Sequence, residues 1–113
     1  MISLVLPIQT VSEANCRDHW RAKAKRVKQQ RLIARALTPA TPISCVVTLV
    51  RVSYRALDDD NLRSALKAVR DGVADKLGVN DRDPSVQWRY DQARGEPCVH
   101  VTLEATARAG EAA

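Results

Sequence analysis

The chain has 113 residues, of which 45% are hydrophobic and 27% charged, and this composition is typical of one soluble globular domain with a modest core. Its 18 Lys and Arg residues against 13 Asp and Glu residues give a net charge of +5, which favours contact with a polyanion. Aromatic residues make up only 4% of the chain and Phe is absent, which disfavours a single-strand binder that stacks several bases on aromatic rings.

The cysteines and the N-terminal segment indicate the cellular compartment. Cys16, Cys45 and Cys98 form no Cys-x-x-Cys pair, so we expect buried free thiols and no zinc site. The apolar run at 2–6 is too short for a signal peptide and lacks a basic lead, and no stretch has membrane-spanning length. These features predict a cytoplasmic protein.

Hydrophobic periodicity and turn residues predict six elements. In chain order they are a strand at 2–6, a helix at 15–37, a strand at 45–54, a helix at 61–77, and strands at 86–92 and 98–104. Prolines after residue 37 end the first helix, and the turn at 93–97 predicts a hairpin of the last two strands.

The order β-α-β-α-β-β predicts a small α/β (α+β) fold. We expect a mixed sheet of about four strands, with two main helices packed on it. Residues 1–105 would form this single domain. The segment 106–113 is rich in Ala and Gly and is expected to be a disordered tail.

An acidic run, Asp58-Asp59-Asp60-Asn61, lies between the predicted central strand and the second helix. Adjacent carboxylates repel one another unless water, protons or a cation relieves the repulsion. In an extended segment Asp58 and Asp60 point the same way, and two converging carboxylates offer the oxygen ligands that Mg²⁺ prefers. A third carboxylate from the loop at 78–84 would complete a one- or two-metal phosphodiesterase site.

Helix capping is the alternative interpretation of this run. Asp and Asn at the start of a helix are what capping and the helix dipole favour. Capping accounts for one or two acids but hardly for three, and it does not account for the second acidic loop. An EF-hand is disfavoured because no Gly follows at the required place and no Glu closes the loop.

Three motifs follow one another in the chain: Asp58-Asp59-Asp60-Asn61-Leu62, then Lys67-Ala68-Val69-Arg70-Asp71-Gly72-Val73, then Gly78 with Asp81-Arg82-Asp83. Together they resemble the RusA-like Holliday junction resolvases, which are crossover junction endodeoxyribonucleases. The resemblance covers about residues 45–104. It implies a homodimeric, phage- or prokaryote-encoded enzyme of DNA recombination and repair that uses Mg²⁺, with Mn²⁺ as a substitute.

The resemblance also implies roles for individual residues. Asp58 and Asp60 match the two motif aspartates that hold Mg²⁺ in the family, and Lys67 matches the catalytic lysine by its spacing to Asp71. Lys67 departs from the family pattern because it stands three residues further along the helix, and Ser64 occupies the family position. One extra helical turn keeps roughly the same face.

The third family aspartate has two candidates in the acidic loop. Counting back from the strand that begins near Val86 favours Asp83, with Asp81 as the alternative. The implied catalytic set is therefore Asp58, Asp60, Asp83 and Lys67, and the metal ligands would come from Asp58, Asp60, Asp83 and Asp81.

Cations crowd the first predicted helix. They include Arg17, Arg21, Lys23, Lys25, Arg26 and Lys28, and Asp18 is almost the only acid among them. This imbalance favours a surface that contacts DNA phosphates over an ordinary solvated helix face. We expect Trp20 to anchor this helix to the sheet.

The leading hypothesis is a Mg²⁺-dependent endonuclease that resolves four-way junctions or related branched DNA by paired hydrolysis of phosphodiesters. One alternative is a branched-DNA-binding protein without turnover, which the displaced lysine favours. Another is an interaction module whose basic helix docks on an acidic protein.

Overall fold

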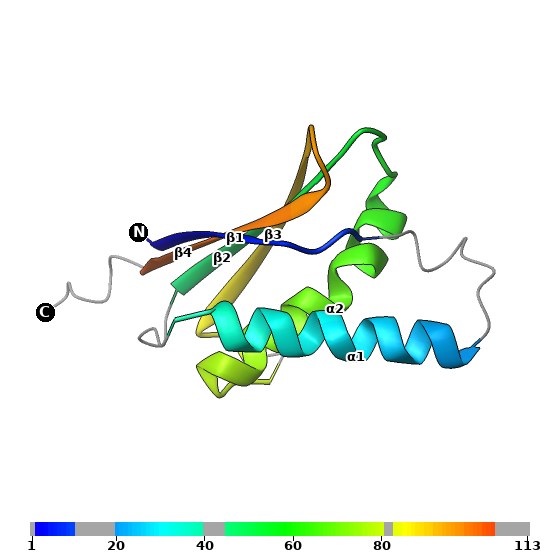
Figure 1. The fold of residues 1–113 in the computed structure, drawn as a ribbon. Helices are drawn as coiled ribbons and strands as arrows, with labels where there is room; N and C mark the ends of the chain where they lie inside the picture. The colour runs from blue at the N-terminus through cyan, green and yellow to red at the C-terminus, as the bar shows by residue number, and fades with distance from the viewer. Residues whose placement is uncertain (1, 11–19, 40–44, 81–82, 106–113) are drawn as a thin grey trace, which may run out of the picture.

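The described residues of the chain, in a computed structural model, are 2–10, 20–39, 45–80 and 83–105. Their six elements are β1 (Ile2–Leu6), α1 (Trp20–Leu37), β2 (Cys45–Ser53), α2 (Asp59–Leu77), β3 (Val86–Arg94) and β4 (Cys98–Ala105). This confirms the predicted α+β fold, with a mixed four-stranded sheet, two helices and the order β-α-β-α-β-β (Figure 1). The predicted tail and Cys16 lie outside the described residues.

The strand order of the sheet is β1-β4-β2-β3. Strand β2 pairs with β3 in parallel, while β4 is antiparallel to both β1 and β2. The prediction of a hairpin was therefore wrong, because β2 lies between β3 and β4. The turn that joins them crosses the end of β2, where Gly95 N donates to Ser53 O at 3.1 Å.

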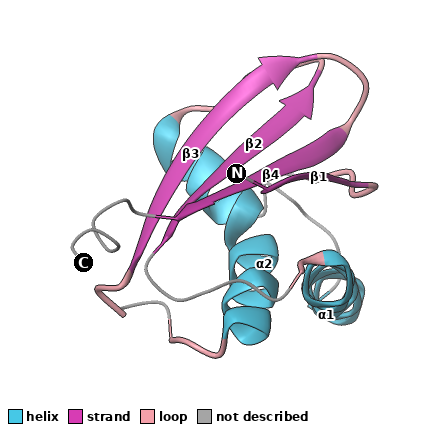
Figure 2. Ribbon diagram, turned by 90° about the vertical axis from the view of Figure 1, so that its left-hand side faces the viewer, coloured by secondary structure: helices cyan, strands magenta, loops and turns pink. Residues whose placement is uncertain are grey.

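Both helices cover the same face of the sheet (Figure 1; Figure 2). The core combines inward-facing strand residues with the apolar stripe of α2. Its buried members include Leu6, Cys45, Val47, Leu49, Val99, Val101 and Leu103 from the strands, and Leu62, Leu66, Val69 and Val73 from α2. The stripe with steps of three and four residues is thus the buried side of this helix. Among the described residues, Cys45 and Cys98 are free thiols.

Helix α1 packs mainly on α2 and leaves most of its own surface in solvent. Only Gln30 and Ala34 are buried among its residues. At the crossing point Gly72 of α2 approaches α1 so closely that a Cβ there would lie 2.7 Å from the Cβ of Ala34. The exposed remainder of α1 includes Lys23, Lys25 and Lys28. No helix of the described part is long and apolar enough to cross a membrane.

A bidentate ion pair joins the two helices beside this crossing. Arg31 Nε and a terminal guanidinium nitrogen donate to the two Asp75 oxygens at 2.7 and 2.8 Å. Mainly because of these hydrogen bonds, the pKa of Asp75 lies below its ordinary value. Because the side chains are 49% and 29% exposed, solvent screening limits the contribution to about 0.5–1 kcal/mol.

The Arg31–Asp75 pair predicts a pH-dependent contribution to stability. A carboxylate whose folded pKa is lowered stabilises the fold above its unfolded pKa of about 3.9, and this contribution is lost as the pH falls through the lower folded value. We expect Asp75→Asn to lower the Tm by a few degrees at pH 7 and by nothing measurable once the carboxyl group is protonated. Thermal unfolding followed by circular dichroism from pH 7 to pH 2.5 measures this difference.

Glu104→Gln is the matched control, since Glu104 is an exposed residue of β4. It is expected to leave the Tm almost unchanged across the same range. A Tm difference between wild type and Asp75→Asn that stays constant down to pH 2.5 would contradict the role of the pair.

Candidate metal and nucleic-acid site

The acidic run forms the start of α2, directly after the connection from β2. Asp58 is the N-cap, with extended backbone angles of −72° and 171°, and its Oδ1 accepts a hydrogen bond from Asn61 N at 2.9 Å. The helix begins at Asp59, two residues earlier than predicted. Asp59 and Asp60 are helical, so the alternation of side chains in an extended segment does not apply to them. The prediction that Asp58 and Asp60 point the same way because the segment is extended was therefore wrong.

A side chain of the edge strand β3 holds the backbone just before these acids. Leu57 N donates to Gln92 Oε1 at 2.9 Å, and Gln92 Nε2 donates to Leu57 O at 2.7 Å. This pair of hydrogen bonds ties the acidic segment to the sheet. Asp58, Asp59 and Asp60 themselves are exposed. The carboxylates are therefore presented to solvent from an anchored backbone.

A buried arginine on β2 supports the same segment. Arg51 is 6% exposed and lies opposite Gln92 in the register of β2 with β3. Its Nε donates to Thr10 Oγ1 at 2.9 Å and a terminal nitrogen donates to Arg55 O at 2.7 Å. Burial lowers the pKa of Arg51 from its ordinary value, yet an arginine stays charged at ordinary pH.

Arg51 and Gln92 hold the backbone before the acidic run, and neither residue is predicted from the sequence to do so. A signal existed for Arg51, because it continues the alternation of Cys45, Val47 and Leu49 on the buried face of β2. A charged residue at an inward-facing strand position needs polar partners, and these partners mark a polar region at the end of the sheet.

Asp83 lies at the opposite end of the sheet. Its Oδ1 accepts hydrogen bonds from Ser85 Oγ at 2.6 Å and from Ser85 N at 2.9 Å. These bonds, the hydroxyl first, lower the pKa of Asp83. The carboxylate thus closes a turn that leads into β3. Asp81, the alternative third ligand, lies outside the described residues.

The separation of Asp83 from the acidic run follows from the parallel pairing of β2 and β3. Cys45 pairs with Val86 and Ser53 pairs with Arg94, so residues before β3 and residues after β2 are at opposite sheet ends. Helix α2 spans this distance with 19 residues, about 28 Å. Among the described residues no three His, Cys, Asp or Glu side chains gather as a metal site. Asp83 therefore does not lie near Asp58 and Asp60 within one chain, in contrast to the expectation from the sequence.

Lys67 lies on the outward face of α2, as predicted. It is seven residues past Asp60, which is two helical turns or about 10 Å along the axis. Its Nζ lies 3.2 Å from Asp71 Oδ2, and the side chain is 67% exposed. Lys67 therefore shares a face with Asp60 while its ammonium group is paired one turn further from the acids.

The predicted phosphate-contacting cations of α1 are mostly in solvent. Arg21, Lys23, Lys25 and Lys28 are exposed, Arg26 is half-buried, and Arg17 lies outside the described residues. Trp20 is 66% exposed, so it does not anchor the helix to the sheet as expected, and the guanidinium of Arg21 lies 5.2 Å from the centre of its ring.

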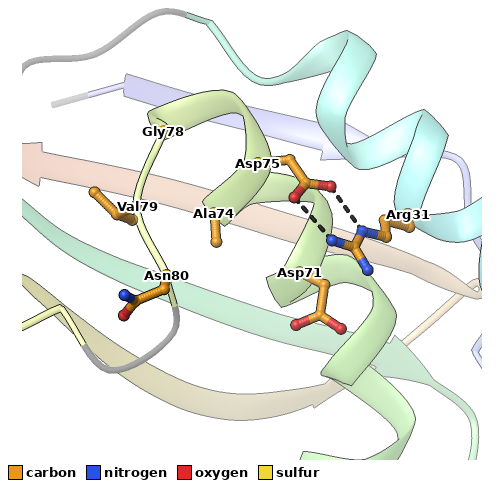
Figure 3. A pocket seen from close by; sticks show the side chains of 7 residues that line it. All are labelled: Arg31, Asp71, Ala74, Asp75, Gly78, Val79 and Asn80. Atoms are coloured by element: carbon orange, nitrogen blue, oxygen red, sulfur yellow. Dashed lines mark hydrogen bonds and ion pairs between the residues drawn. The ribbon is translucent and has the colours of Figure 1, made fainter.

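Two hollows lie beside α2 on the side of α1. The first, about 230 Å³, is lined by Lys23, Val27, Gln30, Ser64, Ala65, Lys67, Ala68 and Asp71. Cations of both helices therefore face one depression. The second, about 470 Å³, lies near the C-terminal end of α2, and there Arg31 and Asp75 bond to each other (Figure 3). Its position separates it from the acidic run.

The chain is similar to a bacterial protein. An uncharacterized protein from Xylella fastidiosa (strain Temecula1) is 36% identical over 94 residues, which cover 73% of this chain and 61% of the relative. The chain thus spans about three fifths of the length of that bacterial protein. No family model matches the chain, and no solved structure matches it.

Proposed function

We propose that this chain is a Mg²⁺-dependent endonuclease that cuts branched DNA, with the four-way junction as its substrate. The observation that carries the proposal is the anchored, exposed acidic segment at the start of α2, followed along the helix by a depression that Lys23 of α1 and Lys67 of α2 line. Gln92 holds the backbone N–H and C=O of Leu57, and Arg51 holds the backbone carbonyl of Arg55. The motif resemblance to RusA-like resolvases supports the same conclusion.

The donor set fits Mg²⁺ even without Asp83. Capping engages Oδ1 of Asp58 and leaves Oδ2 without a hydrogen bond to the described residues, and the Asp60 carboxylate is exposed. Mg²⁺ in phosphoryl-transfer sites is commonly held by one or two carboxylates together with substrate phosphate oxygens and water. Asp58 and Asp60 would hold the ion, which supplies activation of the attacking water and neutralisation of phosphate charge.

The cations would position the DNA and offset charge. Lys67 lies on the same outward face as Asp60, and its ammonium group would leave Asp71 to reach a phosphodiester above the first turns of α2. That group would stabilise the negative charge that develops on the leaving oxygen. Exposed cations of α1 would contact backbone phosphates further along the DNA. A homodimer would place two such sites on the two equivalent strands of a junction.

A junction-cleavage assay tests the proposal. Wild-type protein with a labelled synthetic four-way junction is expected to give paired, symmetric nicks with Mg²⁺ or Mn²⁺ and none with EDTA. Asp60→Asn should abolish the nicks, because it removes a charged ligand from the exposed site. Asp91→Asn is the matched control, since Asp91 is exposed on β3 and alternates with the helix-facing residues Tyr90 and Gln92. Intact junctions with every divalent metal and pH would contradict the proposal.

The second candidate is a branched-DNA-binding protein without turnover. Two observations favour it: Asp83 stands at the far end of the sheet, and Lys67 is paired with Asp71. Salt-sensitive gel shifts of equal strength in EDTA and in Mg²⁺, without products, would select it.

A further inference from the structure

A second basic region lies on the other side of α2, against the edge strand β3. Its hollow of about 350 Å³, named here the α2–β3 pocket, is lined by Arg63, Ser64, Lys67, Arg70 and Tyr90. Three of these five residues are cations and none is an acid. No role is predicted from the sequence for Arg63, Arg70 or Tyr90.

Aromatic side chains of β3 order the two arginines. Arg70 donates to the Tyr90 hydroxyl at 2.6 Å, and its guanidinium lies 4.7 Å from the centre of the Trp88 ring. The Arg63 guanidinium lies 5.3 Å from the centre of the Tyr90 ring. Such contacts restrict the arginine rotamers before any ligand binds, so that binding costs less side-chain conformational entropy. The Arg63 side chain is exposed, so its planar guanidinium can reach an acceptor in solvent.

The lining has the chemistry of a phosphate site. Guanidinium groups match phosphate oxygens with paired N–H donors, and an ammonium and hydroxyls add further donors. The Tyr90 oxygen accepts from Arg70, so its own proton can be donated to a ligand oxygen. A hollow of this size holds a phosphodiester with part of its sugar.

The pocket adjoins the acidic segment and the hollow between the helices. Arg63 is three residues past Asp60 on α2, or about 5 Å along the axis. Ser64 and Lys67 line both this pocket and the hollow that contains Lys23. Cationic and hydroxyl groups therefore continue across α2 from α1 to β3, directly beyond the acids.

We infer that the α2–β3 pocket binds a backbone phosphate of DNA, adjacent to the phosphate at Asp58 and Asp60. This inference rests on the proposed function for the identity of the neighbouring site. It assigns the pocket the task of setting which phosphodiester lies over the acids. Arg63 is its main contact, because it is exposed and nearest to them.

Binding without cleavage provides the first test. Fluorescence anisotropy in EDTA, with a labelled four-way junction, is measured at several salt concentrations for the wild type, Arg63→Gln and Arg89→Gln. Arg89 is a matched control because it has the same charge and lies on β3 between Trp88 and Tyr90, so it faces the opposite side of the sheet. Arg63→Gln is expected to bind about tenfold more weakly and to reduce the salt slope by about one. Arg89→Gln should change both the DNA affinity and the salt slope by less than Arg63→Gln does.

Titration with inorganic phosphate provides a second test that needs no DNA. In nitrogen–proton NMR spectra, the indole resonance of Trp88 is expected to shift and saturate, while that of Trp20 stays in place. The shift should be lost in Arg63→Gln/Arg70→Gln. Equal losses of DNA affinity for Arg63→Gln and Arg89→Gln, or no phosphate-dependent shift of Trp88, would overturn the inference.

The two proposals can fail separately. If the wild type nicks junctions in a metal-dependent way but Arg63→Gln binds DNA like Arg89→Gln, the phosphate pocket is refuted and the nuclease proposal stands. A wild type that never nicks, yet shows the Arg63 effect and the Trp88 shift, would remove the nuclease and keep the pocket.

Discussion

Gly72→Ala is expected to lower the free energy of unfolding by up to about 2 kcal/mol. A Cβ at this position would lie 2.7 Å from the Cβ of Ala34 and would overlap the backbone carbonyl of Arg31. Both neighbours belong to α1, and neither is the end of a flexible side chain, so the two helices would have to separate. Urea unfolding followed by circular dichroism measures the change.

Two effects of this substitution have opposite signs. Inside a helix Ala is favoured over Gly by about 1 kcal/mol, so propensity alone predicts a more stable protein. Forced contacts in a packed interior cost about 1–3 kcal/mol or more, and the backbone of Arg31 cannot move without moving α1. We therefore expect overpacking to decide the sign.

Gly78→Ala is the matched control for Gly72→Ala. Gly78 caps α2 with a φ of 73°, and a Cβ there meets nothing within 4 Å. Its cost should be the strain of a left-handed alanine, about 1 kcal/mol, without any effect on the packing of α1. A Gly72→Ala protein as stable as the wild type would show that the helices do not approach as the structure has them.

Asp58→Asn and Asp58→Ala together should separate capping from catalysis. Asn caps a helix as well as Asp does, whereas Ala lacks the acceptor that binds Asn61 N and costs about 1 kcal/mol. The two variants are therefore expected to differ in stability. Both should lose junction cleavage by at least about a hundredfold, because each lacks the charged metal ligand.

The measurements are urea unfolding and single-turnover cleavage of a labelled junction in Mg²⁺. Asp91→Asn again controls for the change in net charge, and it is expected to keep both stability and cleavage. Full cleavage by Asp58→Asn would reduce Asp58 to a helix cap, and the proposal of a metal site at this position would fail.

The helical part of the fold was readable from the sequence because its signals are local. The spacing of Leu62, Leu66, Val69 and Val73 identifies one buried stripe whatever else the chain does. Gly78 marks the end of the same helix, since a residue with positive φ favours glycine. The sequence predicts a start at Asn61, two residues late, because an extended backbone is expected through Asp60, whereas Asp58 is the N-cap and Asp59 is already helical.

Strand neighbours were not readable in the same way. Alternation predicts that β3 and β4 are strands, but it carries no information about which strand lies beside which. The short turn at Gly95 suggested a hairpin, whereas the chain passes over the end of β2 and pairs β4 there. Long-range hydrogen bonding decides between these arrangements.

The candidate site shows the same division. The sequence by itself determined the acidic run, the outward face with Asp60 and Lys67, and the excess of cations on α1, because charge and helical periodicity are properties of neighbouring residues. Only the tertiary structure decided that Asp83 lies away from the run and that Tyr90 meets Arg63 and Arg70. The physical reason is the parallel pairing of β2 with β3. It places α2 along the sheet, leaves Asp83 at the end of the sheet away from the acidic run, and sets the aromatic residues of β3 against the arginines of α2.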